Sequence, residues 1–134
     1  MEIFNALDKA PVKIETYPYK GKPYKVKEVW IRWLSQAGPK DSPEYGLRFF
    51  TIGPAGEIPI HNHFYHQTMY ILDGEFECWE FDPETDELIT KAICGPGTSI
   101  YIPSMEPHGM KNVCDRDSTF LCCICNVYKS EEIV

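Results

Sequence analysis

Short segments in which apolar and polar residues alternate run through most of the chain, and turn residues separate them. The 134 residues include eleven prolines and nine glycines. Strict alternation is the pattern of a half-buried β-strand, whereas an amphipathic helix needs apolar residues three and four positions apart. Many short strands between regular breaks are typical of a sandwich or barrel. The sequence therefore predicts an all-β fold.

The alternating segments predict eight strands and no long helix. The expected strands cover residues 25–34, 45–52, 67–72, 75–81, 87–94, 98–102, 108–113 and 118–128, and residues 3–10 have a weakly helical pattern. Asp73-Gly74 is the strongest hairpin signal, because a type I′ turn needs positive φ. No repeat or linker divides the chain, so we expect a single domain over residues 1–134.

Charge and composition argue against several classes of function. The net charge is −7, whereas nucleic-acid binding calls for a concentrated positive patch. No apolar run approaches the ~20 residues that a membrane span requires. The first residues lack the basic and then apolar pattern of a signal peptide, so we expect a cytoplasmic protein with reduced thiols. Lys20, Lys22, Lys25 and Lys27 are interpreted as the lysines of an edge strand.

Residues 30–34 and 119–125 are apolar on both faces of their expected strands. A solvated sheet alternates apolar and polar residues, so something covers the second face. We favour a second copy of the chain, a homodimer, over another sheet of the same chain, since two-fold pairing is the commonest oligomeric arrangement. Cys122, Cys123 and Cys125 lie in the second segment and are interpreted as small buried side chains.

The four histidines are distributed unevenly along the chain. Three fall within residues 61–66, and the fourth, His108, follows a proline-containing turn. In an extended segment His61, His63 and Gln67 share one face with Tyr65, whereas His66 faces the other way. His108 can close a metal site from a neighbouring strand. The residues therefore predict a metal centre.

These residues resemble the two sequence motifs of the cupin superfamily. The first motif, at residues 56–74, appears as Gly56, His61-Asn-His63, Gln67 and Gly74, and the second, at 97–112, as Gly97, Pro103-Ser-Met105, His108 and Asn112. There are three departures: Gly56 is one residue nearer His61 than usual, Met105 replaces a glycine, and Gln67 replaces the usual glutamate.

The resemblance implies a double-stranded β-helix, or jelly-roll barrel. It implies His61, His63 and His108 as metal ligands, with Gln67 as a further ligand through its amide oxygen. The cofactor it implies is a divalent transition metal, and Zn, Mn, Fe, Ni and Cu all suit imidazole and oxygen donors.

A glutamine in place of glutamate leaves the bound ion with both of its positive charges, and so makes it more electrophilic. We therefore expect a small metalloenzyme in which the ion acts as a Lewis acid, with isomerase- or lyase-type chemistry on an oxygen-rich, anionic metabolite. A metal-dependent dioxygenase and a non-catalytic module that binds a small ligand remain open. His66, Glu106 and Tyr65 are candidates for an acid or base.

Overall fold

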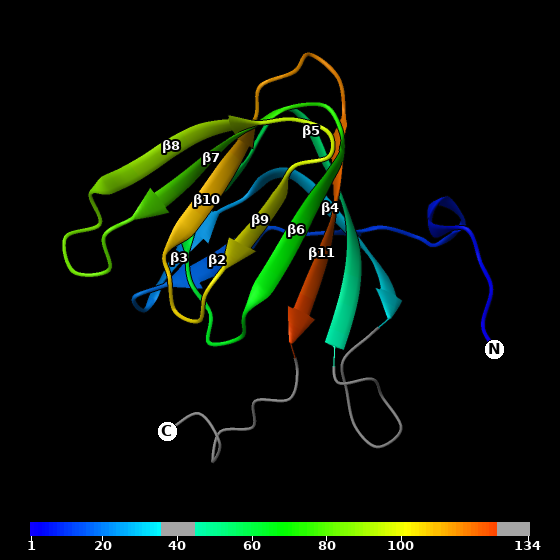
Figure 1. Cartoon of the computed structure of the whole chain (residues 1–134), viewed down its shortest axis with the longest axis horizontal. Helices are drawn as coiled ribbons and strands as arrows, with labels where there is room; N and C mark the ends of the chain where they lie inside the picture. The colour runs from blue at the N-terminus through cyan, green and yellow to red at the C-terminus, as the bar shows by residue number, and fades with distance from the viewer. Residues whose placement is uncertain (36–44, 126–134) are drawn as a thin grey trace.

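The computed structural model describes residues 1–35 and 45–125, and this part of the chain consists mainly of antiparallel strands that curl into a barrel (Figure 1). The strands are β1 (Val12–Lys13), β2 (Thr16–Tyr19), β3 (Lys22–Lys25), β4 (Lys27–Ser35), β5 (Tyr45–His61), β6 (Gln67–Asp73), β7 (Phe76–Phe81), β8 (Leu88–Cys94), β9 (Ser99–Ile102), β10 (His108–Asn112) and β11 (Ser118–Cys125). The predicted all-β jelly-roll class is confirmed.

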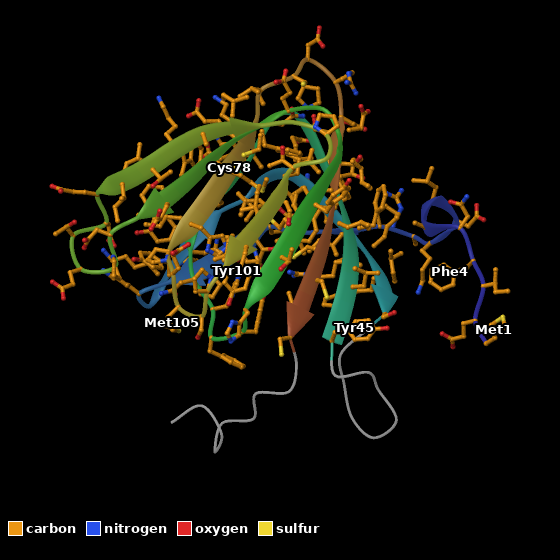
Figure 2. The ribbon with its side chains drawn as sticks, viewed as in Figure 1. Met1, Phe4, Tyr45, Cys78, Tyr101 and Met105 are labelled. Carbon is orange, nitrogen blue, oxygen red and sulfur yellow. The ribbon has the colours of Figure 1, made fainter. Side chains whose placement is uncertain are left out.

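Hydrogen bonds join seven strands in the order β8-β7-β10-β5-β11-β6-β9. Strand β4 pairs with β5 and with β1, and β2 and β3 form a separate two-stranded sheet. Among the described strands β3 pairs only with β2, so Lys22 and Lys25 lie on an edge strand, as predicted. The prediction is wrong for Lys20, which lies in the turn before β3, and for Lys27, which lies on β4 and pairs with β5. The weakly helical pattern near the N-terminus yields only one short 3-10 turn, η1 (Ala6–Asp8). This segment, with Phe4, stands to one side of the barrel (Figure 2).

Strand β5 pairs with different strands along its length, and its last residue is His61. Its first half pairs with β4 and β11, and its last residues pair with β10. Between them, a Cβ on Gly56 would lie 2.6 Å from Ile52 Cγ2, so the chain bends where only glycine fits. We predicted a strand that ends at residue 52. The observed strand continues past this bend to His61.

The Asp73-Gly74 pair does not form the predicted hairpin. Strand β6 pairs with β9 and β11, whereas β7 pairs with β8 and β10. Gly74 has the positive φ of 84° that the prediction required. A Cβ at this position would collide with Ser118 of β11. Gly74 therefore lies in the connection between β6 and β7, which do not pair with each other. At this point the backbone passes close to β11.

The barrel interior is packed with aromatic and aliphatic side chains from alternate strand positions. Phe50 and Phe120 stack with their ring centroids 4.6 Å apart, and Phe76 meets Phe120 edge-on at 5.4 Å. On β11 the alternation buries Cys122 and leaves Cys123 exposed. The interpretation of the cysteines as buried is therefore correct for Cys122 and wrong for Cys123, which lies on the outward parity of the strand, whereas Cys125 is half-buried.

The outer faces of the barrel raise the question of a partner. Residues 126–128, which we expected to extend the last strand, lie outside the described residues. Within residues 1–35 and 45–125, no helix is long and apolar enough to cross a membrane. The homodimer, the cytoplasmic location and the single-domain organisation stay predictions.

Candidate metal centre

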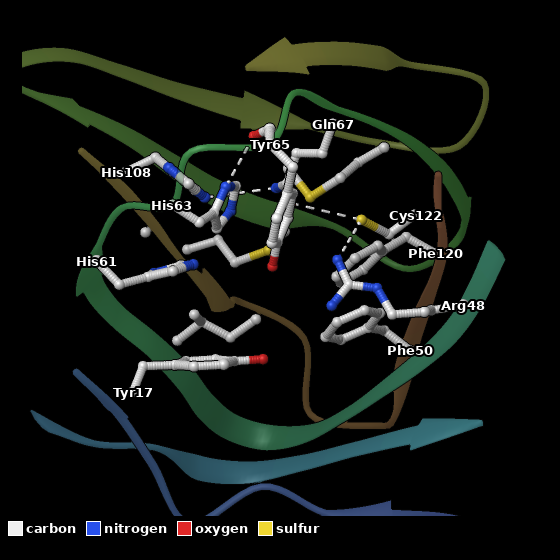
Figure 3. Close-up of a pocket in the computed structure, with 14 residues that line it drawn as sticks. Tyr17, Arg48, Phe50, His61, His63, Tyr65, Gln67, His108, Phe120 and Cys122 are labelled. Carbon is white, nitrogen blue, oxygen red and sulfur yellow. Dashed lines mark hydrogen bonds between the residues drawn. The ribbon is translucent and has the colours of Figure 1, made fainter. Parts of the chain in front are cut away.

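Three histidines from two paired strands and a loop converge at one point inside the barrel. His61 is the last residue of β5, His108 is the first of β10, and the two are directly paired across the sheet. His63 lies in the loop that follows β5. One possible ligand atom from each of the three side chains lies within 4.8 Å of the others. The structure thus brings together the three histidines that the sequence singled out (Figure 3).

The backbone reaches this arrangement by a different route from the one we predicted. We treated residues 61–67 as one extended segment, but β5 ends at His61 and β6 begins only at Gln67. The chain bends at Phe64 and Tyr65 in between. His66 still falls outside the cluster: its Nδ1 lies 2.6 Å from the Tyr101 hydroxyl.

The protein orients all three imidazoles through the ring nitrogen that does not face the cluster. In each, Nδ1 lies 2.8–3.0 Å from a backbone carbonyl oxygen two residues away in the chain, that of Pro59, Tyr65 or Glu106. A carbonyl only accepts, so Nδ1 carries the proton and the lone pair is on Nε2. The Nε2 atom of His63 is buried and has no hydrogen-bond partner. This is the donor arrangement that metal-binding histidines show.

The histidines are also held in the neutral form that a metal requires. Burial lowers the pKa of both His61 and His63 to about 4. Burial, and next the nearby His61, lower the pKa of His108 to about 2. At neutral pH all three imidazoles are therefore uncharged, and no proton must leave before an ion binds. The donor set fits a divalent transition metal ion.

Gln67 lies beside the histidines, at the start of β6. It is buried, and its Nε2 atom lies 3.4 Å from His108 Nε2. Its Oε1 atom accepts a weak hydrogen bond from Cys122 Sγ at 3.7 Å. The amide can turn by 180° about its last side-chain bond, which exchanges its donor and acceptor positions. In that orientation its oxygen points to the cluster, as the role of ligand requires.

Two tyrosines stack on the histidines and line the pocket beside them. Tyr17 of β2 lies on His61 at a centroid distance of 4.7 Å, and Tyr65 lies on His63 at 3.9 Å. Burial raises the pKa of Tyr17 to about 12 and also raises that of Tyr65. Both phenols stay protonated at neutral pH, so they can donate hydrogen bonds into the pocket. Sequence reasoning missed Tyr17 because residues 16–19 were not recognised as a strand.

Glu106 lies beside the centre and orients one of its histidines through the backbone. Its carbonyl oxygen orients His108, while its side chain lines a neighbouring pocket with Trp79 and Tyr101. Partial burial, and next the charge of Glu80, raise the pKa of its carboxyl group. Of the three acid or base candidates, only Tyr65 lines the pocket that the histidines share.

Arg48 is a residue of this pocket that sequence reasoning missed. It lies on β5, is only 6% exposed, and donates from Nη2 to Cys122 Sγ at 2.9 Å. The sequence did contain a signal that Arg48 is buried, because Arg48 has the same strand parity as the buried Phe50 and Ile52. An arginine in the core pattern of a strand is rare enough to mark a functional position.

Comparison with known proteins places this geometry in a family. A profile for the cupin domain matches residues 48–124. No curated protein sequence matches the chain. Among solved structures, the polyketide cyclase RemF from Streptomyces resistomycificus is similar, with 26% identity over 99% of this chain and 89% of that chain and a TM-score of 0.69.

Two more distant structures share the fold. A cupin-2 domain from Rhodospirillum rubrum, Rru_A2000, is 18% identical over 96% of this chain and 77% of its own, with a TM-score of 0.67. A variant of oxalate decarboxylase from B. subtilis is 17% identical, also with a TM-score of 0.67, and the match covers 96% of this chain and 30% of that chain.

Proposed function

This chain belongs to the cupin family, and from that premise we propose that it is a metal-dependent enzyme with non-redox, isomerase- or lyase-type activity. In this proposal a divalent ion is held by His61, His63, His108 and Gln67, and the substrate is an oxygen-rich, anionic metabolite. The observation that carries the proposal is the convergence of three buried, neutral imidazoles whose Nδ1 atoms are all fixed by backbone carbonyls.

The ligand set favours Lewis-acid chemistry. When bound, a divalent ion polarises a carbonyl or hydroxyl oxygen of the substrate and stabilises negative charge that develops there. Gln67 contributes an amide where a glutamate would contribute a charge, so the protein itself cancels none of the charge of the ion. The three histidines are neutral for the reasons given above, and the pocket they share lies against the aromatic core.

The protein side chains around the centre orient and shield the substrate. Tyr17 and Tyr65 fix the planes of two imidazoles by stacking and keep water away from one side of each. Their protonated phenols can donate hydrogen bonds to a substrate oxygen. Neither is a base at neutral pH, because burial raises both pKa values.

The similarity to a polyketide cyclase supports the non-redox choice. Closing a ring by carbon–carbon bond formation requires an activated carbonyl group and no external oxidant. A substrate with ketone or enol oxygens would suit both this chemistry and an electrophilic ion.

An activity screen with and without oxygen tests the proposal. The metal-loaded full-length protein is incubated with keto acids, hydroxy acids and polycarbonyl compounds, and products are followed by mass spectrometry. We expect isomers, cleavage products or dehydrated cyclic products that form equally well under anaerobic conditions. Turnover that consumes oxygen in step with product would instead identify a dioxygenase. Tight binding without any turnover would indicate a non-catalytic binding protein.

A further inference from the structure

Within residues 1–35 and 45–125, no carboxylate pairs with the buried guanidinium of Arg48. Arg48 is 6% exposed, donates to the sulfur of Cys122 and also contacts the Tyr65 phenol. Its Nε atom is a buried donor without a hydrogen-bond partner. The ion pairs of the described residues are Lys20–Asp86 and Arg116–Asp73, and both are exposed. Arginine stays protonated in folded proteins, so this charge has no matching anion among the residues that the structure describes.

The groups around Arg48 hold the cation in place without neutralising it. Its guanidinium carbon lies 4.9 Å from the ring centroid of Phe50 and 5.5 Å from that of Trp33. Aromatic faces attract a cation but accept no strong hydrogen bond in its plane. A thiol sulfur is only a weak acceptor. An isolated buried charge is costly, and proteins usually pair it.

Arg48 lines the same cavity as the histidines. Figure 3 shows the guanidinium pointing inward from β5, with the Tyr65 ring between it and the histidine cluster. The cavity, counted as the space open to the centre of a water molecule, is about 30 Å³. That is room for roughly two waters. A space of this size can take a carboxylate group but not an aromatic ring.

We propose that Arg48 is the anion-binding end of this pocket and that it takes the carboxylate of a small organic acid. The planar fork of a guanidinium matches a carboxylate with two parallel hydrogen bonds, and Nε–H is one of the donors available for them. With a metal at the histidines, the same molecule presents a keto or hydroxyl oxygen there. This second half rests on the proposed function, whereas anion binding at Arg48 does not.

The test follows the Arg48 Nε–H signal by ¹H–¹⁵N NMR in full-length protein, both as purified and after chelation. Acetate is titrated against acetamide, its neutral analogue of the same shape. The signal is assigned by its loss in Arg48→Lys. We expect acetate to shift it in a saturable way and to bind at least about tenfold more tightly than acetamide, as hydrogen bonds to charged groups do. Arg116→Gln removes an exposed arginine and serves as the matched control, with unchanged acetate binding.

Equal binding of acetate and acetamide, or acetate binding that leaves the Arg48 signal in place, would overturn the inference. The comparison is made on the wild-type protein, so it does not depend on a variant that folds. Metal content is measured on the same samples. Acetate binding at Arg48 in a protein that takes up no metal would sink the proposed function and leave this site standing. Metal uptake without acetate binding would overturn the inference about Arg48 and leave the proposed function standing.

Discussion

The two ends of the pocket differ in charge and in the kind of ion that each would bind. At one end, three neutral imidazoles and an amide offer lone pairs and no charge. At the other, Arg48 carries a full positive charge, and a thiol, the Tyr65 phenol and aromatic faces surround it. The first end is complementary to a cation and the second to an anion. The comparison indicates a pocket for a molecule that bridges a metal ion and a guanidinium.

The largest effect that we expect concerns acid stability, which depends on the histidine end. The folded-state pKa values of His61 and His63 are lowered from 6.5 to about 4. Below pH 6.5 the unfolded chain therefore binds more protons than the folded chain, and stability falls as the pH drops from 6.5 toward 4. Without metal, we expect a loss on the order of a few kcal/mol over this window, as measured by urea unfolding at each pH.

His108→Ala should make that pH dependence shallower, because it removes a third lowered pKa. A stability that does not change between pH 6.5 and 4 would show that these imidazoles are not buried as neutral groups.

The next effect is expected when a negative charge is added at the histidine end. Gln67→Glu places a negative charge next to His108 and, through Cys122, close to Arg48. The new carboxylate would cancel one charge of the ion and compete with the anion at Arg48. We expect turnover to fall by about 10- to 100-fold, with tighter binding of Mn. Full turnover with an unchanged metal preference would contradict the charge argument.

A smaller and opposite effect is expected from the Arg48 end. Arg48→Met keeps much of the side-chain length and removes the unpaired charge. We expect the ligand-free protein to gain about 1–2 kcal/mol in free energy of unfolding, because apolar replacement of buried charges is often stabilising. Acetate binding should be lost at the same time. Chemical denaturation against Arg116→Gln measures the gain, and a clear loss of stability would mean that Arg48 already has an adequate partner.

The smallest effect is expected between the two ends, at Tyr65. Tyr65→Phe keeps the ring that stacks on His63 and removes the phenol. Metal content should not change, and turnover should fall by about tenfold as one hydrogen bond is lost. A loss of 1,000-fold or more, within the range about 10²–10⁴ of general acid catalysis, would make Tyr65 the proton donor and not only a hydrogen-bond donor.

The same contrast shows what could be predicted from the sequence. His61, His63 and His108 stand out because histidine is rare in this chain and their spacing matches a known motif. Their convergence was therefore predictable, although their role as ligands stays a prediction. Arg48 is one arginine among many charged residues, and only its strand parity distinguishes it. Its burial depends on Cys122 and Phe50, which come together only in the folded barrel.

The strand boundaries were easier to predict than the connections between strands. Positive φ at Gly74 suits a hairpin and a sheet crossing equally well, so a local signal could not choose between them. The choice was made by the contact with Ser118, which is 44 positions further along the chain. Likewise the bend at Gly56, which carries β5 on to His61, depends on the backbone of Gly53 and Lys27 around it.

The most direct test of the metal centre is metal content, measured by elemental mass spectrometry on protein purified without a histidine tag. The wild-type protein is compared with His108→Ala and with His66→Ala, which removes a neighbouring histidine that lies outside the cluster. The account predicts close to one equivalent of a divalent transition metal in the wild-type protein and in His66→Ala, and its loss in His108→Ala. No metal in any of the three after reconstitution, or equal metal in all three, would contradict it.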